Sequence, residues 1–246
     1  MFVGGWLRII MMTSTLVLAL FIGLVYPAYF VLTHKKTNNQ IKIDERFKLA
    51  DYKRTIFIFW TTTILILINS FYDQGLDLNL YPVFNIVGIV LSVLVILFIL
   101  FQLKQLVVTY ETAPAVRERL GEVYDYLPKT KIELNWFILL SISAGICEEI
   151  IFRVFLFSVL VQDAGLIVAF VLTNITFALT HIGSGKQNLL SSFILGLLFT
   201  SIYYFTNNIW IVVVLHTAID INAGVLGYRI KLAGADSVAK NLNIID

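Results

Sequence analysis

The sequence has few charged residues and almost no cysteine. Cys147 is the single cysteine among 246 residues, so no intrachain disulfide can form, and cysteine usage carries no information about redox compartment. Charged residues make up only 14% of the chain, against 59% hydrophobic residues, and the mean hydropathy is +0.86. This composition excludes an ordinary soluble core and is typical of a membrane protein with several spans.

The chain also lacks a strong excess of charge of either sign, with a formal net charge of +2. Its basic residues gather between apolar runs, where orientation in a bilayer accounts for them. We therefore expect no nucleic-acid partner. An internal repeat, a heptad array and a low-complexity segment are likewise missing from the sequence.

Long apolar runs dominate what is present. The first is too long for a secretory signal and has no clear cleavage site, so we interpret it as a membrane helix. Lipid permits only helices or closed barrels, and these runs lack the alternation of barrel strands. We predict an all-α, polytopic membrane helical bundle of about seven transmembrane helices, at residues 9–32, 55–72, 81–103, 136–161, 166–182, 189–205 and 209–228.

The basic residues alternate along this series of helices and predict its orientation. They are frequent in residues 34–54 and 104–134, which we interpret as two basic cytoplasmic loops, and they recur in the polar tail, residues 229–246. The positive-inside rule then places the N-terminus outside and the C-terminus in the cytoplasm. Within the second loop, residues 116–126 have the apolar spacing of a short amphipathic helix, and Pro82 suits the first turn of the third span.

Charges inside the fourth predicted span are the most unusual feature of the sequence. Glu148, Glu149 and Arg153 stand in an apolar run, where a central charge costs at least a few kcal/mol. Residues four apart share a helix face, so Glu149 and Arg153 are expected to pair, whereas Glu148 is turned about 100° away. We interpret the pair as structural and Glu148 as an unpaired carboxylate with a chemical role.

Two further predicted spans carry ionisable or polar residues. His181 and His216 lie in separate apolar runs, and Asp220 follows His216 by four residues, on the same helix face. Asn174 precedes His181 by seven residues and shares its face, where it is expected to join helices or to line the same cavity. Intramembrane ionisable groups face the interior or a watery cavity. Glu148 and His181 could together deprotonate a water, and His216 with Asp220 could stabilise an oxyanion.

Three motifs carry a family resemblance. Glu148-Glu149-x-x-x-Arg153, Phe177-x-x-x-His181 and His216-x-x-x-Asp220 resemble, in order, the motifs of the CAAX protease and bacteriocin-processing (CPBP or Abi) family. The family includes the type II CAAX prenyl endopeptidases, which are intramembrane glutamic proteases. The resemblance covers roughly residues 136–228.

The resemblance implies a role for each matched position. It implies that Glu148 is the catalytic base, that His181 is its partner, and that His216 and Asp220 stabilise the oxyanion. Glu149 and Arg153 match the supporting pair. Asparagine is common in the family where Asp220 stands, and an ionised aspartate would repel an oxyanion, so Asp220 is expected to be protonated or to orient His216.

The predicted organisation follows from these assignments. Residues 1–135 form N-terminal membrane helices, residues 136–228 a catalytic core, and residues 229–246 a cytoplasmic polar tail. The expected function is an intramembrane, metal-independent endopeptidase of a bacterial plasma membrane, with no cofactor and a cavity that opens toward the cytoplasm. Its partners are expected to be membrane lipid and a hydrophobic or amphipathic peptide, such as a bacteriocin, a peptide signal or a CAAX-like tail.

Three other interpretations of the same residues stay open. The histidines and carboxylates could be zinc ligands, although the sequence lacks a His-Glu-x-x-His motif. The chain could be a non-catalytic bacteriocin-immunity or scaffold protein. Finally, the buried charges could form the proton relay of a transporter, against which the missing repeat argues. A serine protease would use Ser184, which stands between Gly183 and Gly185 close to His181, and we interpret this segment as a cytoplasmic turn.

Overall fold

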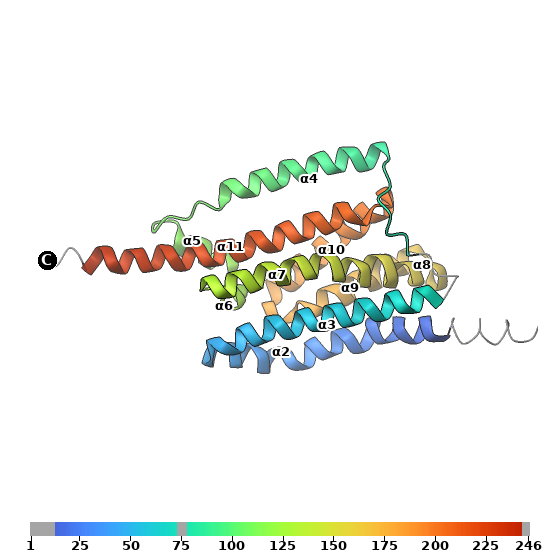
Figure 1. Ribbon diagram of the computed structural model, residues 1–246, viewed down its shortest axis with the longest axis horizontal. Helices are drawn as coiled ribbons and strands as arrows, with labels where there is room; N and C mark the ends of the chain where they lie inside the picture. Colours follow the sequence, from blue (N-terminus) through green and yellow to red (C-terminus); the bar gives the residue numbers. More distant parts are fainter. Residues whose placement is uncertain (1–12, 73–77, 243–246) are drawn as a thin grey trace, which may run out of the picture.

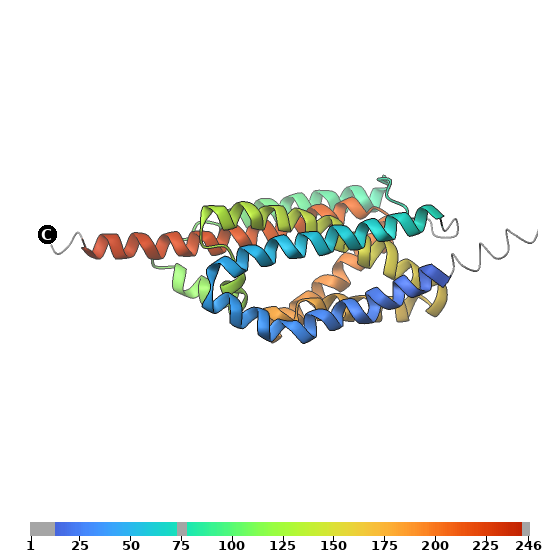
Figure 2. The same ribbon diagram turned by 60° about the horizontal axis from the view of Figure 1, so that its bottom comes forward.

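The computed structural model describes residues 13–72 and 78–242, and none of these residues forms a strand. The all-α prediction is therefore confirmed for the described part of the chain. Figures 1 and 2 show long helices that run roughly along one common axis, with shorter helices at one end of the bundle. Five helices are long and apolar enough to cross a membrane: Thr13–Ile43, Arg46–Tyr72, Ile86–Lys104, Lys186–Thr206 and Ile209–Gly234. Their apolar, outward-facing side chains mark an integral membrane protein.

The first membrane helix contains the π-helical segment η1 (Phe21–Val25) and continues as α2 (Tyr26–Ile43). Asp44 adopts extended backbone angles, and α3 (Glu45–Tyr72) follows it at once. The prediction of a loop at residues 34–54 is therefore wrong, since only Asp44 interrupts the helices. Lysine, glutamine and arginine are good helix formers, so a polar stretch can extend two helices beyond the membrane. The predicted start of the first span, residue 9, lies outside the described residues.

The third predicted span begins later than expected. α4 (Ile86–Gln105) is capped by Asn85, whose Oδ1 accepts a hydrogen bond from the Gly88 amide at 2.7 Å. Pro82 lies before this cap in non-helical chain, so its placement in the first helical turn is wrong. The Asn85 side chain accepts a hydrogen bond from a free backbone amide of the first turn, which a proline side chain cannot do. This interaction sets the start of α4.

Two short helices replace the amphipathic helix expected at residues 116–126. α5 (Ala113–Leu120) ends at Gly121, which has φ +54°, and α6 (Val123–Tyr126) follows. A positive φ with ψ −136° suits glycine, which has no Cβ atom, and strains other residues. The position of Gly121 therefore divides the predicted helix in two.

The charged motif lies in the middle of one continuous helical rod. α7 (Lys131–Glu148) leads directly into the π-helical η2 (Glu149–Phe157) and then α8 (Ser158–Ala164). Every residue of η2 is buried. π-Helical turns are rare and occur frequently at functional sites, and this one begins immediately after Glu148.

The remaining helices are α9 (Leu166–Thr180), the short 3₁₀ helix η3 (Ile182–Ser184), α10 (Lys186–Thr206) and α11 (Ile209–Leu242). Ser184 thus lies in a tight 3₁₀ turn, as expected. The predicted span at residues 209–228 and the polar residues that follow it form one helix through Leu242. The predicted cytoplasmic tail therefore starts within a helix.

α7 packs between α3 and α11, which brings the fourth and last predicted spans together (Figure 1). Gly145 makes the contact with α11 close, because a Cβ atom there would lie 2.0 Å from Thr217 Oγ1. α2 packs on α9, on the other side of η2 (Figure 2). This crossing of α7 and α11 places Glu148 and Glu149 opposite His216.

Candidate active site

Three carboxyl groups surround the His216 ring in the interior of the bundle. Glu149 Oε1 lies 2.7 Å from His216 Nδ1, and the nearest oxygens of Glu148 and Asp220 each lie 3.6 Å from His216 Nε2. Glu148, Glu149 and His216 are almost completely buried, whereas the Asp220 side chain is 35% exposed. Residues from two helices thus form one cluster of titratable groups.

Glu149 is the central acceptor of this cluster. Its Oε1 accepts hydrogen bonds from Arg153 Nη1 at 2.9 Å and from His216 Nδ1 at 2.7 Å. The Arg153 contact is the i,i+4 ion pair that the sequence spacing predicts. The guanidinium also lies over the rings of Phe177, at 4.2 Å, and Phe199, at 5.4 Å. A fully buried arginine is therefore neutralised by one carboxylate and held between aromatic faces.

Glu148 is turned away from that pair and faces a cavity. It lies outside the Glu149–Arg153 pair, as the helix spacing predicts, and His216 from α11 lies beside its carboxylate. Periodicity within one helix cannot show this contact, because it depends on how α7 and α11 cross. Among the described residues, no donor makes a hydrogen bond to the Glu148 carboxylate, which leaves its acceptor positions available to water or substrate.

The hydrogen bond to Glu149 fixes the orientation of His216. A carboxylate without a proton can only accept, so Nδ1 carries the hydrogen and Nε2 points toward Glu148 and Asp220. The Phe199 ring stacks at a tilt of 34° with its centroid 5.2 Å from that of the imidazole. His216 thus has one nitrogen reserved for structure and one directed at the carboxyl groups.

His181 lies at the end of α9 and lines the same cavity as Glu148 and Asp220. Its Nδ1 lies 3.1 Å from the Phe177 carbonyl oxygen, which can only accept, so Nδ1 is the donor and Nε2 is left with a free lone pair. The Phe177 ring contacts both imidazoles, with centroids 4.8 Å from His181 and 6.0 Å from His216. Within the described residues, no hydrogen bond or ion pair joins His181 directly to Glu148, so a bridging water or substrate is needed to connect them.

Residues 130–222 match the Rce1-like family of type II CAAX prenyl endopeptidases. This match confirms the resemblance that the three motifs indicate, and all four candidate catalytic residues lie within the matched range, which we call the Rce1-like segment. The family is a protease family, so the match supports a membrane peptidase. No curated protein and no solved structure matches the chain.

Asn174, also in the Rce1-like segment, joins two helices. Its Oδ1 accepts a hydrogen bond from Thr200 of α10 at 3.1 Å, and its Nδ2 donates to the Phe170 carbonyl. Gly196 allows the close contact, because a Cβ atom there would lie 2.7 Å from Asn174 Oδ1. Asn174 is not among the residues that line the cavity, so of the two roles that its spacing allows, the structure shows the interhelical one.

The cavity in front of Glu148 has a volume of about 280 Å³. The Rce1-like segment forms one wall, and α2, α3 and α6 form the other. Near Glu148 the lining is apolar, with Phe59, Leu140 and Ala144. At the other end the lining reaches the surface, where the side chains of Lys42 and Asp125 are 65% and 49% exposed.

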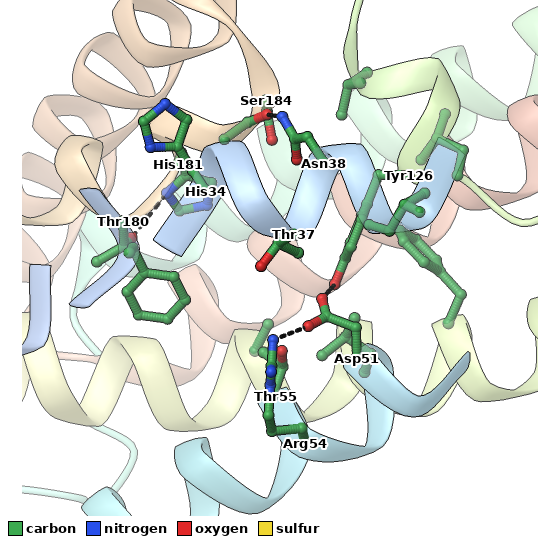
Figure 3. A pocket seen from close by; sticks show the side chains of 18 of the residues that line it. His34, Thr37, Asn38, Asp51, Arg54, Thr55, Tyr126, Thr180, His181 and Ser184 are labelled. Atoms are coloured by element: carbon green, nitrogen blue, oxygen red, sulfur yellow. Dashed lines mark hydrogen bonds and ion pairs between the residues drawn. The ribbon is translucent and has the colours of Figure 1, made fainter. Parts of the chain in front are cut away.

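A polar network on α3 and α6 was missed by the sequence analysis (Figure 3). Asp51 accepts hydrogen bonds from Arg54 and, at 3.2 Å, from Tyr126. Thr37 on α2 faces this network across the cavity, whereas Asn38 donates a hydrogen bond to the Gly183 carbonyl (Figure 3). The network lies in residues 34–54, for which the sequence pattern predicts a loop. The i,i+3 spacing of Asp51 and Arg54 is the signal that could have identified them.

Groups of three or more His, Cys, Asp or Glu side chains with a geometry suited to a metal ion do not occur within residues 13–72 and 78–242. Hydrogen bonds instead join Glu149 to His216 and Arg153, and Glu148 and Asp220 each lie 3.6 Å from His216 Nε2.

Proposed function

We propose that this protein is an intramembrane, metal-independent glutamic endopeptidase in which Glu148 activates water. The observation that carries the proposal is the Glu148 carboxylate, which has free acceptor positions, faces a cavity and lies 3.6 Å from His216. A buried carboxylate with an imidazole neighbour at the wall of a cavity is a suitable general base. The location of this group within the Rce1-like segment supports the same reaction class.

The reaction is a peptide hydrolysis in which the protein supplies positioning and charge. Glu148 takes a proton from water while the water oxygen forms a bond to the scissile carbonyl carbon, and the free Nε2 of His181 accepts the second hydrogen bond of that water. The developing oxyanion is stabilised by His216 in its imidazolium form, in which Nε2 as well as Nδ1 carries a hydrogen. The carbon–nitrogen bond then breaks, and Glu148 returns its proton to the leaving amine, which gives a carboxylic acid and an amine.

Asp220 acts on this reaction through His216. Its carboxyl group lies 3.6 Å from His216 Nε2 and is partly exposed, so it orients the imidazole without taking part in proton transfer from water. Glu149 and Arg153 hold the other side of the same ring. His216 is thus positioned from both of its nitrogens, which is the preorganisation that oxyanion stabilisation requires.

The substrate is a hydrophobic or amphipathic peptide, such as a bacteriocin precursor, a peptide signal or a CAAX-like tail. The cavity combines an apolar region beside Glu148 with a polar region around Asp51 and Arg54, and a peptide of mixed character complements both. Its volume of about 280 Å³ accommodates a few side chains and not a folded domain. Substrate therefore binds as an extended segment.

The proposal includes seven membrane helices, with the N-terminus outside and the C-terminus in the cytoplasm of a bacterial plasma membrane. α9 and the continuous rod of α7, η2 and α8 add two spans to the five helices that are long and apolar enough alone. Lys42 of α2 and Arg54 of α3 line the cavity, and Lys42 lies at the end that reaches the surface. The positive-inside rule then directs this end to the cytoplasm.

Mass spectrometry of cellular peptides tests the function. Cells with the wild-type protein are compared with cells that carry Glu148→Gln, which is nearly isosteric, and Glu118→Gln, an exposed acid on α5, is the matched control. We expect at least one cleaved peptide to disappear with Glu148→Gln and to persist with Glu118→Gln.

The alternatives give different outcomes. An immunity or scaffold protein would leave both the peptide pattern and the cellular phenotype unchanged in a stably folded Glu148→Gln variant. A zinc protease would lose activity in a chelator and regain it when zinc is added, whereas the proposed enzyme keeps full activity in the chelator.

A further inference from the structure

Tyr26 presents a buried hydroxyl group without a partner. It is the first residue of α2 and is 4% exposed. Its oxygen makes no hydrogen bond within the described part of the chain. A hydroxyl group withdrawn from water without a hydrogen bond costs about 1–3 kcal/mol in proteins. Phenylalanine would fill the same space without that cost, so the hydroxyl group itself requires an explanation.

The packing of Tyr26 places it against the helix that carries Glu148. Its ring meets the Phe152 ring edge-on, with centroids 6.2 Å apart, and the Phe30 ring at 5.3 Å. Phe152 stands four residues after Glu148 in the rod of α7 and η2, and Tyr26 packs in one core cluster with Phe152 and Cys147. Cys147 is buried and free and is a weak acceptor. The strong acceptor in the neighbourhood is therefore the Glu148 carboxylate.

The Tyr26 hydroxyl group lacks an acceptor among the described residues, and the Glu148 carboxylate lacks a donor there. Tyr26 has a donor without an acceptor, and no donor in the described residues reaches the carboxylate of Glu148. A phenol donates readily to a carboxylate, and hydrogen bonds to charged groups are the strong ones.

The backbone is irregular on both sides of this contact. The π-helical η1 ends directly before Tyr26, and the π-helical η2 begins directly after Glu148. These two segments pack against each other. A π-turn shifts the side chains that follow it relative to an α-helix, so each irregularity changes which side chains meet at this contact.

We propose that Tyr26 is a positioning residue that donates a hydrogen bond to the Glu148 carboxylate, directly or through one water, and so holds it in the orientation that faces the cavity. The inference rests on the proposed function, because it assigns Tyr26 to the base of that reaction. Tyr26 lies outside the Rce1-like segment, so the first membrane helix completes a site whose other residues lie within residues 130–222.

Tyr26→Phe tests this proposal, because it removes one oxygen and keeps the ring. Tyr204→Phe is the control for loss of a tyrosine hydroxyl group elsewhere, since Tyr204 lies on α10 against Phe157 and Phe170 and does not line the cavity. Peptide cleavage, melting temperature and the infrared carboxyl band of Glu148, assigned by its loss in Glu148→Gln, are measured for each variant. We expect Tyr26→Phe to lower kcat about 10-fold at unchanged KM and melting temperature, and to shift the Glu148 band. Tyr204→Phe leaves all of these unchanged.

Other outcomes overturn the inference or the proposed function separately. An unshifted band with unchanged kcat shows that the hydroxyl group does not act on Glu148. A fall in melting temperature together with a changed KM assigns Tyr26 to structure alone. If the wild-type protein cleaves none of the peptides that its cells contain, the proposed function fails, and the infrared band then decides the position of Tyr26 by itself.

Discussion

Two buried ion pairs hold the continuous rod of α7 and η2, one at the first turn of α7 and one within η2, and they differ in how well they are satisfied. At the first turn, Lys48 Nζ lies 2.8 Å from Glu133 Oε2 and also donates to the Leu127 carbonyl. Glu133 accepts a further bond from the Lys129 amide. Within η2, Arg153 Nε and Glu149 Oε2 find no hydrogen-bond partner among the described residues. The first pair is complete, and the second keeps unused hydrogen-bonding capacity.

This difference indicates that the Lys48–Glu133 pair is structural and that the Glu149–Arg153 pair supports the candidate active site. Backbone groups make the remaining hydrogen bonds of the Lys48–Glu133 pair. This pair joins α3 to the start of α7. The Arg153 pair shares Glu149 with His216, so its geometry also sets the orientation of the imidazole. Incompletely satisfied buried groups occur where function restricts the sequence. We therefore expect the first pair to be replaceable and the second to be irreplaceable.

The largest effect is expected for Arg153→Met. Removal of one partner of a buried pair leaves an uncompensated charge and costs about 3–5 kcal/mol. Glu149 would then carry only the His216 contact, so peptide cleavage should disappear as well. Thermal unfolding in detergent measures the loss of stability, and retention of wild-type stability and cleavage would contradict the role assigned to this pair.

Lys48→Met and the double variant Lys48→Met/Glu133→Leu give a smaller and reversible effect. The single variant leaves Glu133 unpaired and should cost about 3 kcal/mol. The double variant removes both charges, so its stability should return to within about 2 kcal/mol of the wild type, with cleavage retained. An equal loss in both variants, measured by the same unfolding assay, would show that the charges themselves are needed.

The smallest expected effect is a pH dependence of stability that arises from Lys129, next to the Lys48–Glu133 pair. Burial and the nearby charge of Lys48 lower the pKa of Lys129 from 10.5 to about 7. Between these values the unfolded chain holds a proton that the folded protein has released, so stability should rise as pH increases from about 7 to 10.5. Melting temperatures at pH 6.5 and 9 should differ less in Lys129→Met than in the wild type. A pH dependence that is the same in both proteins would remove Lys129 as its source.

Local periodicity is sufficient to predict several features of the fold and site. The apolar runs predict where most helices lie, and the i,i+4 spacing predicts the contacts of Glu149 with Arg153 and of His216 with Asp220. These relations are contained within one helix. They depend on helix geometry alone, which the sequence pattern determines directly.

Relations between helices could not be predicted in this way. The contact of Glu148 with His216 depends on the crossing of α7 and α11, which Gly145 and Thr217 allow. The polar wall of the cavity depends on helical extensions of α2 and α3, whose residues pair with distant partners such as Glu133 and Tyr126. Hydropathy predicts the apolar length of a helix. The tertiary contacts of its polar residues determine how far the helix continues beyond the apolar run.

Cleavage by purified Glu148→Gln is the measurement that tests the central claim most directly. The wild-type, Glu148→Gln and Glu118→Gln proteins are purified in detergent and incubated with a peptide that the wild-type protein cleaves in cells. The account predicts that Glu148→Gln keeps the wild-type melting temperature and loses cleavage by about 1,000-fold or more, as expected for a general base. Cleavage by a folded Glu148→Gln protein within a few-fold of the wild-type rate would contradict it.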